Sequence, residues 1–194
     1  MVNLAINGIG RIGKLVLKLL ISKNFNVKYL NELNGNTNSL IHSIEFDSIH
    51  GKWQANIEDG KDEIKIDGKS IKATFVENIN DLNLEDVDIM IDCTGVYKST
   101  AKLQKYFDKG VKKVIVSAPI NEDNIVNIAY GVNHNIYKPK EHNIITGASC
   151  TTNCIAPIIK VLHENIGISH GSITTIHNLT NSQTLVDIPH NDLR

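Results

Sequence analysis

The first 31 residues carry the pattern that most restricts the fold: a buried strand, a glycine-rich turn, a helix and a second strand. Val2–Asn7 is mostly apolar, as expected of a strand buried on both faces. Leu15–Ile21 has helical periodicity, and Val27–Asn31 has the composition of another strand. A β-α-β unit of this length predicts a parallel sheet with a crossover helix.

The turn of this unit has three glycines at the spacing that binds a dinucleotide. Residues 7–13 read Asn-Gly-Ile-Gly-Arg-Ile-Gly. Gly8 permits a tight turn, Gly10 lets a pyrophosphate approach the backbone, and Gly13 allows the helix to pack closely on the strand. Glu32 ends the second strand, where a carboxylate binds ribose hydroxyls and repels a 2′-phosphate. The pattern predicts NAD binding; the alternative is a glycine-rich turn in a flavodoxin-like domain.

The remaining apolar segments continue the alternation of strands and helices. We expect helices at Ser39–Phe46, Thr100–Lys109 and Ile155–Leu162, and a hairpin formed by Ile64–Ile66 and Ile71–Phe75. Further strands are expected at Val87–Asp92, Val114–Ser117, Ile125–Tyr130, Asn143–Thr146 and Ile173–Ile176. The sequence therefore predicts an α/β chain with a Rossmann-type, mainly parallel sheet in residues 1–149, followed by the beginning of an α+β catalytic domain in residues 150–194.

Two later strand ends are candidates to complete the cofactor site. Ligands collect beyond the carboxyl ends of parallel strands, where this chain has Thr94, Gly95 and Ser117. Ordinary turn chemistry is the alternative explanation for these residues.

Cys150 is the candidate nucleophile. It lies where the strand Asn143–Thr146 gives way to an apolar-periodic helix. The unpaired N–H groups and positive end of a helix N-terminus favour a thiolate over a thiol, so the pKa of a cysteine there falls. His177, at the end of the segment Ile173–Ile176, is the best candidate base, with a structural histidine as the alternative. Cys154, one helical turn beyond Cys150, is expected to be a small buried residue.

Composition excludes several classes of function. The formal net charge is −1 with no basic block, so no nucleic-acid partner is expected. No apolar run is long enough to span a bilayer, and the histidines lack a metal-ligand spacing, so neither a membrane nor a metal is expected. Three cysteines, and Met1 leading directly into a strand, predict a cytoplasmic protein that is not secreted.

Six segments together resemble one family, the phosphorylating, NAD-dependent glyceraldehyde-3-phosphate dehydrogenases. They are residues 7–13, Asp47-Ser48-Ile49-His50-Gly51, Ser117-Ala118-Pro119, Ser149-Cys150-Thr151-Thr152-Asn153-Cys154, Thr174-Thr175-Ile176-His177 and Pro189-His190-Asn191-Asp192-Leu193-Arg194. The resemblance covers the whole chain, and Ile188-Pro189 resembles the NAD-dependent rather than the photosynthetic members.

The resemblance implies a role for each matching residue. Cys150 would attack glyceraldehyde 3-phosphate with His177 as its base, and inorganic phosphate would release 1,3-bisphosphoglycerate from the thioester. The other implied contacts are Arg11, Ile12, Glu32 and Ser117 to NAD, and Ser149, Thr151 and Thr180 to phosphate or substrate oxygens. The family also implies a homotetramer and a place in glycolysis or gluconeogenesis.

The chain departs from the family pattern in four ways. Glu32 and Ser182 stand where aspartates are usual, and Val76-Glu77-Asn78 lacks the arginine commonly found beside the adenine. The family sequence also continues beyond the equivalent of Arg194, so we expect 194 residues alone to bind NAD weakly and to produce little NADH. The alternatives are an inactive NAD-binding or interaction fragment and an erythrose-4-phosphate dehydrogenase.

Overall fold

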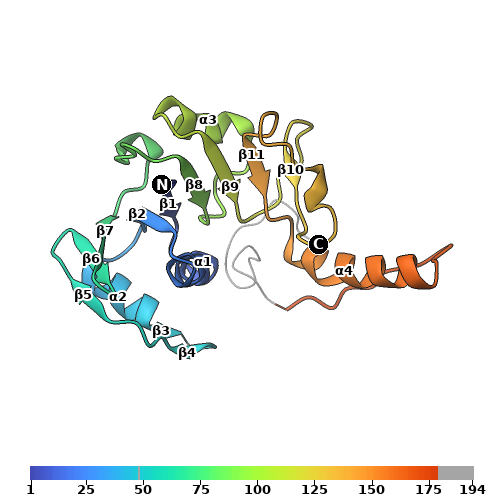
Figure 1. Cartoon of the computed structure of the whole chain (residues 1–194), viewed down its shortest axis with the longest axis horizontal. Coiled ribbons are helices and arrows are strands. Elements are labelled where there is room, and N and C mark those ends of the chain that lie inside the picture. The colour runs from blue at the N-terminus through green and yellow to red at the C-terminus, as the bar shows by residue number, and fades with distance from the viewer. Residues whose placement is uncertain (48, 179–194) are drawn as a thin grey trace, which may run out of the picture.

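The computed structural model describes residues 1–47 and 49–178 (Figure 1). A nine-stranded sheet has the order β10-β11-β9-β8-β1-β2-β7-β6-β5. Its parallel part contains β1 (Asn3–Asn7), β2 (Asn26–Asn31), β7 (Lys69–Thr74), β8 (Ile89–Asp92), β9 (Lys113–Val116), β10 (Val126–Asn127) and β11 (Ile144–Thr146). This arrangement confirms the predicted α/β class with a mainly parallel sheet.

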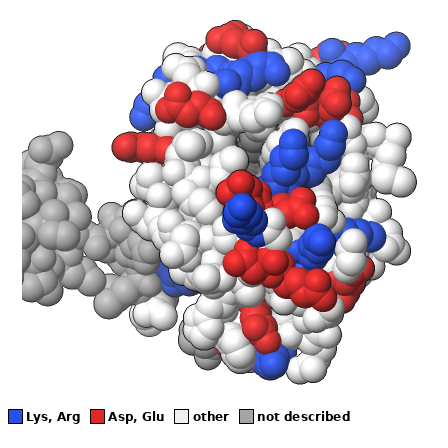
Figure 2. Space-filling view, turned by 90° about the vertical axis from the view of Figure 1, so that its left-hand side faces the viewer, with Lys and Arg blue, Asp and Glu red and all other residues white. Residues whose placement is uncertain are grey.

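Antiparallel strands complete one edge of the sheet. β5 (Ile57–Asp59) and β6 (Glu63–Ile66) continue antiparallel from β7. The predicted hairpin between β6 and β7 is confirmed, and Asp67 and Gly68 at its turn both have positive φ. Exposed residues of both charge signs lie on β5 and β7, and the face in Figure 2 shows acidic and basic groups interspersed.

Helices cover the two faces of the sheet. Figure 1 shows α3 (Thr100–Asp108) on one face and α1 (Arg11–Ser22) on the other, with α2 (Thr37–Glu45) beside the antiparallel strands. Along β1, Leu4 and Ile6 join the core cluster that contains Leu17 of α1. Ala5, between them, joins the cluster that contains Leu103 of α3. Alternate side chains of one strand therefore fill two cores, as expected for a strand buried on both faces.

A short hairpin lies beyond α2. β3 (Phe46–Asp47) and β4 (Gly51–Lys52) pair antiparallel, so Phe46 belongs to a strand and not to the predicted helix. Asp47 accepts hydrogen bonds from the N–H groups of Ile49 and His50 and pairs with Lys14 of α1. The Lys14 ammonium and these N–H groups hold the pKa of the Asp47 carboxyl well below its usual range. The ion pair attaches this hairpin to the helix that begins at the glycine turn.

The chain leaves the sheet through α4 (Cys150–Asn165), which projects from the end of the domain in Figure 1. None of its side chains is buried by the described residues. No helix within residues 1–47 and 49–178 is both long enough and apolar enough to cross a membrane.

One strand prediction is wrong and another is only partly confirmed. The expected strand Ile173–Ile176 is irregular, and Ile173 and Ile176 are 63% and 99% exposed. A strand requires a hydrogen-bonded neighbour, and the described residues place none beside this segment. The expected strand Ile125–Tyr130 is confirmed only at Val126–Asn127, where β10 pairs with β11. The Asn127 side chain also bonds the backbone of Ile120, in the loop that follows β9.

Candidate functional site

The carboxyl ends of the central parallel strands enclose a cavity of about 300 Å³. Its walls come from the segments that follow β1, β2, β7 and β8. Five expected cofactor residues line it: Asn7, Gly8, Gly10, Glu32 and Thr94. The position matches the switch point of an open parallel sheet, where β2 and β8 extend from opposite sides of β1.

The glycines of the first turn have different surroundings. A Cβ on Gly13 would lie 1.9 Å from the carbonyl oxygen of Gly8, so α1 packs directly on the turn. A Cβ on Gly10 would have nothing within 4 Å, and the φ of Gly10 is −72°, which any residue adopts. Neither backbone conformation nor contact within the described chain therefore requires glycine at position 10. A ligand approaching the backbone there would require it.

Glu32 closes one side of the cavity. Its Oε2 accepts a hydrogen bond of 2.7 Å from the N–H of Ile9, and its Oε1 accepts one of 2.9 Å from the N–H of Leu33. The carboxylate is thus fixed between the glycine turn and the end of β2.

Other expected cofactor residues lie along the same sheet edge but not in this cavity. Arg11 and Ile12 are exposed in the first turn of α1, and Gly95 follows Thr94 with a φ of +71°. Ser117, at the end of β9, hydrogen-bonds the Cys93 thiol. Burial raises the pKa of that thiol to about 11, so Cys93 remains protonated.

Several residues that line the cavity were not among the cofactor residues predicted from the sequence. They follow the carboxyl ends of β2, β7 and β8, the same signal that pointed to Thr94, and include Asn31, Leu33, Asn34, Val76, Glu77, Val96 and Tyr97. Their positions could be predicted only after the order of the strands was known.

Cys150 is the first residue of α4. Ser149 precedes it as the N-cap, and its hydroxyl accepts a hydrogen bond of 3.0 Å from the N–H of Thr152. The Cys150 thiol is exposed, next to Thr151. The expected placement of this cysteine at a helix N-terminus after β11 therefore agrees with the structure.

His177 lies against this sulfur. The distance from Cys150 Sγ to His177 Nε2 is 3.3 Å, and His177 Nδ1 lies 2.6 Å from the carbonyl oxygen of Asn178. Because a carbonyl only accepts, Nδ1 carries a proton and Nε2 faces the sulfur. The hydrogen bond with His177, followed by one from Thr151, lowers the pKa of Cys150. The same bond, followed by that with Asn178, raises the pKa of His177. Both shifts favour transfer of the proton from Cys150 to His177.

A second cavity, of about 480 Å³, surrounds this pair. Its walls come from the start of α4 and from residues 173–178. Cys154 also lines this cavity and is exposed, so the expectation that it is buried is wrong. Thr180 lies outside the described residues, as do Ser182 and the expected motif at Ile188–Arg194. In the described part of the chain, no group of three or more His, Cys, Asp or Glu is placed to hold a metal.

The two cavities are built on one edge of the sheet. The glycine turn follows β1, Thr94 follows β8, Ser117 follows β9 and Cys150 follows β11, and these strands are parallel neighbours in that order. At the usual spacing of about 4.8 Å, the ends of β1 and β11 are about 14 Å apart. A dinucleotide with its pyrophosphate at the glycine turn can extend along this edge toward the sulfur.

Comparisons with known proteins agree with this geometry. Residues 2–100 match the family model for the NAD binding domain of glyceraldehyde 3-phosphate dehydrogenase, and residues 149–194 match its C-terminal domain. The match over residues 2–100 confirms the cofactor expected from the glycine turn.

Curated relatives match over the whole of this chain. Glyceraldehyde-3-phosphate dehydrogenase 3 of Nostoc is 44% identical over 196 residues, which are 100% of this chain and 58% of the relative. The Thermotoga maritima and Geobacillus stearothermophilus enzymes are 41% and 39% identical, over 100% of this chain and 59% and 58% of their own lengths. The chain thus spans somewhat more than half the length of these relatives. It belongs to the glyceraldehyde-3-phosphate dehydrogenase family.

Proposed function

We propose that the protein catalyses the NAD-dependent oxidation and phosphorylation of glyceraldehyde 3-phosphate through a thioester on Cys150. The observation that carries this proposal is the 3.3 Å contact between Cys150 Sγ and His177 Nε2 at the N-terminus of α4. The contact supplies a nucleophile and a base on the sheet edge that also holds the dinucleotide cavity. The relatives from Nostoc and Thermotoga maritima are named glyceraldehyde-3-phosphate dehydrogenases, which supports the choice of substrate.

Residues of the first cavity would hold NAD. The N–H groups at the start of α1 and the open space at Gly10 suit the pyrophosphate, and the Glu32 carboxylate suits ribose hydroxyls. Arg11, Ile12, Gly95 and Ser117 would contact the dinucleotide elsewhere along the edge. When bound, NAD supplies the acceptor for a hydride.

The residues of the second cavity would carry the covalent steps. The Cys150 thiolate attacks the aldehyde carbon, and the carbonyl π bond opens to an alkoxide, which takes the proton of the His177 imidazolium at Nε2 to give a hemithioacetal. His177 Nε2 removes the hydroxyl proton as hydride leaves the same carbon, which forms a thioester. Inorganic phosphate then attacks the thioester carbon, the C–S bond breaks, and the acyl phosphate and the Cys150 thiolate are released.

Phosphate binding is proposed for Ser149, Thr151 and Thr180. Thr151 lies beside the sulfur in the second cavity, which supports its place near the reacting carbon. The Ser149 hydroxyl already caps α4 and lies 2.8 Å from the Thr152 hydroxyl, so it would bind an anion together with the helix N-terminus.

The proposal extends to the whole protein. We propose that residues 1–149 form a cofactor domain and that a catalytic domain begins at residue 150. We also propose that the protein is a homotetramer and is located in the cytoplasm. Three free thiols, Cys93, Cys150 and Cys154, are consistent with a reducing compartment. The start of the C-terminal family match at residue 149 supports the domain boundary.

Iodoacetate labelling tests the proposal. At pH 7, Cys150 is expected to be carboxymethylated at least about tenfold faster than Cys93, because the hydrogen bond with His177 lowers the pKa of Cys150 and burial raises the pKa of Cys93 to about 11. Peptide mass spectrometry after timed quenching gives the rate at each cysteine. Equal, slow labelling of all three cysteines would contradict an activated nucleophile.

A further inference from the structure

A chain of buried hydrogen bonds lies beneath the dinucleotide cavity. The Tyr106 hydroxyl donates to Asp92 Oδ2 at 2.7 Å and accepts from Asn7 Nδ2 at 2.7 Å. Asn7 Oδ1 in turn accepts from Asn31 Nδ2 at 2.8 Å. Tyr106 and Asp92 are both 0% exposed, so their polar groups are hydrogen-bonded to each other and not to water. One hydroxyl on α3 thus joins the ends of β1 and β8, and Asn7 joins β1 to β2.

Both ends of the chain reach the cavity walls. Asn31 Oδ1 accepts from the Thr74 hydroxyl at 2.9 Å and from the N–H of Val76 at 3.0 Å. At the other end, Asp92 Oδ1 accepts from the hydroxyl and the N–H of Thr94 at 2.8 and 3.1 Å. The bonds connect β7, β2, β1 and β8, which are consecutive in the sheet, and Asn7, Asn31, Val76 and Thr94 line the cavity.

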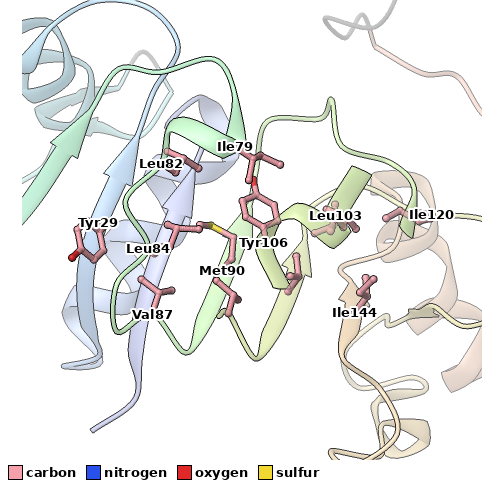
Figure 3. Packing of buried hydrophobic residues seen from close by; sticks show 14 of the residues in the cluster. Tyr29, Ile79, Leu82, Leu84, Val87, Met90, Leu103, Tyr106, Ile120 and Ile144 are labelled. Atoms are coloured by element: carbon pink, nitrogen blue, oxygen red, sulfur yellow. The ribbon is translucent and has the colours of Figure 1, made fainter. Parts of the chain in front are cut away.

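The hydroxyl of Tyr106 has no role in filling the core. Tyr106 packs in the hydrophobic cluster of Figure 3 with Leu103 and Met90, where a phenylalanine ring would occupy the same volume. A hydroxyl buried in such a place destabilises the fold unless it is hydrogen-bonded, and its two partners here are Asn7 and Asp92. The hydroxyl therefore serves to fix the positions of Asn7 and Asp92, at two strand ends that border the glycine turn.

We infer that Tyr106 is a positioning residue for the dinucleotide, holding the ends of β1 and β8 so that the cavity is formed before NAD arrives. The inference rests on the proposed cofactor role of this cavity. A preformed site loses less conformational freedom on binding, so its affinity is higher than that of a site that must be ordered by the ligand. Without the hydroxyl, Asn7 would keep its bond to Asn31 and Thr94 its bonds to Asp92, but the link between the ends of β1 and β8 through Tyr106 would be lost.

The pH dependence of NAD affinity distinguishes a positioning role of Tyr106 from a purely structural one. A positioning role makes this dependence follow the charge of Asp92, whereas a purely structural role leaves it unchanged. Burial raises the pKa of Asp92, while hydrogen bonds from Tyr106 and Thr94 oppose that rise. The other titratable neighbours are Tyr97 and Cys93, whose pKa values are raised by burial first and by the Asp92 charge in addition. Loss of the Tyr106 hydroxyl would raise the pKa of Asp92 further, because a hydrogen bond that lowers this pKa is lost. Protonation of Asp92 would then weaken the charge-assisted hydrogen bonds that hold Thr94.

The test compares NAD binding by the wild-type chain, Tyr106→Phe and Tyr29→Phe. Tyr29 belongs to the same hydrophobic cluster but does not line the cavity, so it is a control for the loss of a tyrosine hydroxyl away from the cavity. Equilibrium titration with NAD at pH 7 is expected to give a Kd about five- to tenfold higher for Tyr106→Phe and within about twofold of wild type for Tyr29→Phe. The deficit of Tyr106→Phe is expected to grow as the pH falls, because loss of the hydroxyl raises the pKa of Asp92 further.

A second variant keeps the inference testable if Tyr106→Phe does not fold. Thr74→Val removes a donor to Asn31 at the far end of the chain of bonds, and a two- to threefold rise in Kd is expected. A folded Tyr106→Phe protein with wild-type affinity at every pH would overturn the positioning role alone. Absence of NAD binding by the folded wild-type chain would overturn the cofactor assignment as well.

Discussion

Gly13→Ala is expected to destabilise the protein by about 3 kcal/mol or more and to abolish NAD binding. The new Cβ would lie 1.9 Å from the Gly8 carbonyl oxygen and 2.9 Å from its carbon. Both obstacles are backbone, so α1 must move away from β1, and the buried contacts of Leu17 and Ile21 would be lost with it. Urea unfolding followed by circular dichroism gives the free energy, and NAD titration gives the affinity.

Gly10→Ala is the matched control in the same turn. A Cβ there meets nothing within 4 Å, so the free energy of unfolding is expected to stay within about 0.5 kcal/mol of wild type. NAD affinity is nevertheless expected to fall at least tenfold, because the methyl group would occupy space proposed for the pyrophosphate. Unchanged NAD affinity in Gly10→Ala would contradict the assignment of the glycine turn.

His177→Asn is expected to slow iodoacetate labelling of Cys150 about tenfold at pH 7. The hydrogen bond with His177 is the largest cause that lowers the pKa of Cys150. A thiol with an ordinary pKa of about 8.5 is only about 3% thiolate at pH 7, and the higher nucleophilicity of the more basic thiolate offsets part of the loss. Timed labelling of Cys150 measures the change.

His170→Asn is the control for this substitution. His170 is exposed and contacts Ser169, outside the cavity around Cys150. Its loss is expected to leave the labelling rate unchanged. An equal effect of the two substitutions, or none from His177→Asn, would mean that His177 does not activate the sulfur.

The elements predicted well from the sequence are those specified by neighbouring residues. The β1–α1–β2 unit follows from periodicity and from the glycines between Asn7 and Gly13, and the β6–β7 hairpin follows from Asp67-Gly68. A helix after β11 was expected at Ile155–Leu162; α4 begins five residues earlier, at Cys150, where the Ser149 side chain caps it. In each case, the residues that decide the structure lie within a few positions of one another.

The features that sequence reasoning missed depend on distant residues. Alternation in Ile173–Ile176 indicates strand propensity, but pairing needs a neighbouring strand that the described residues do not place there. The bond between Asn7 and Tyr106 joins residues 99 positions apart. No local pattern distinguishes this tyrosine from one that only fills the core. The same holds for Asn31 and Val76, which reach the cavity because β2 and β7 are neighbours.

A pH titration of the cysteine 13Cβ resonances tests the central claim most directly, with Cys150, Cys93 and Cys154 assigned by single serine variants. The sulfur at the start of α4 should lose its proton well below pH 8.5, and the Cys93 signal should stay unchanged until the pH approaches 11. A Cys150 midpoint at or above 8.5 in the folded protein would show that the adjacent imidazole does not stabilise an anionic sulfur, and the proposed reaction would lose its nucleophile.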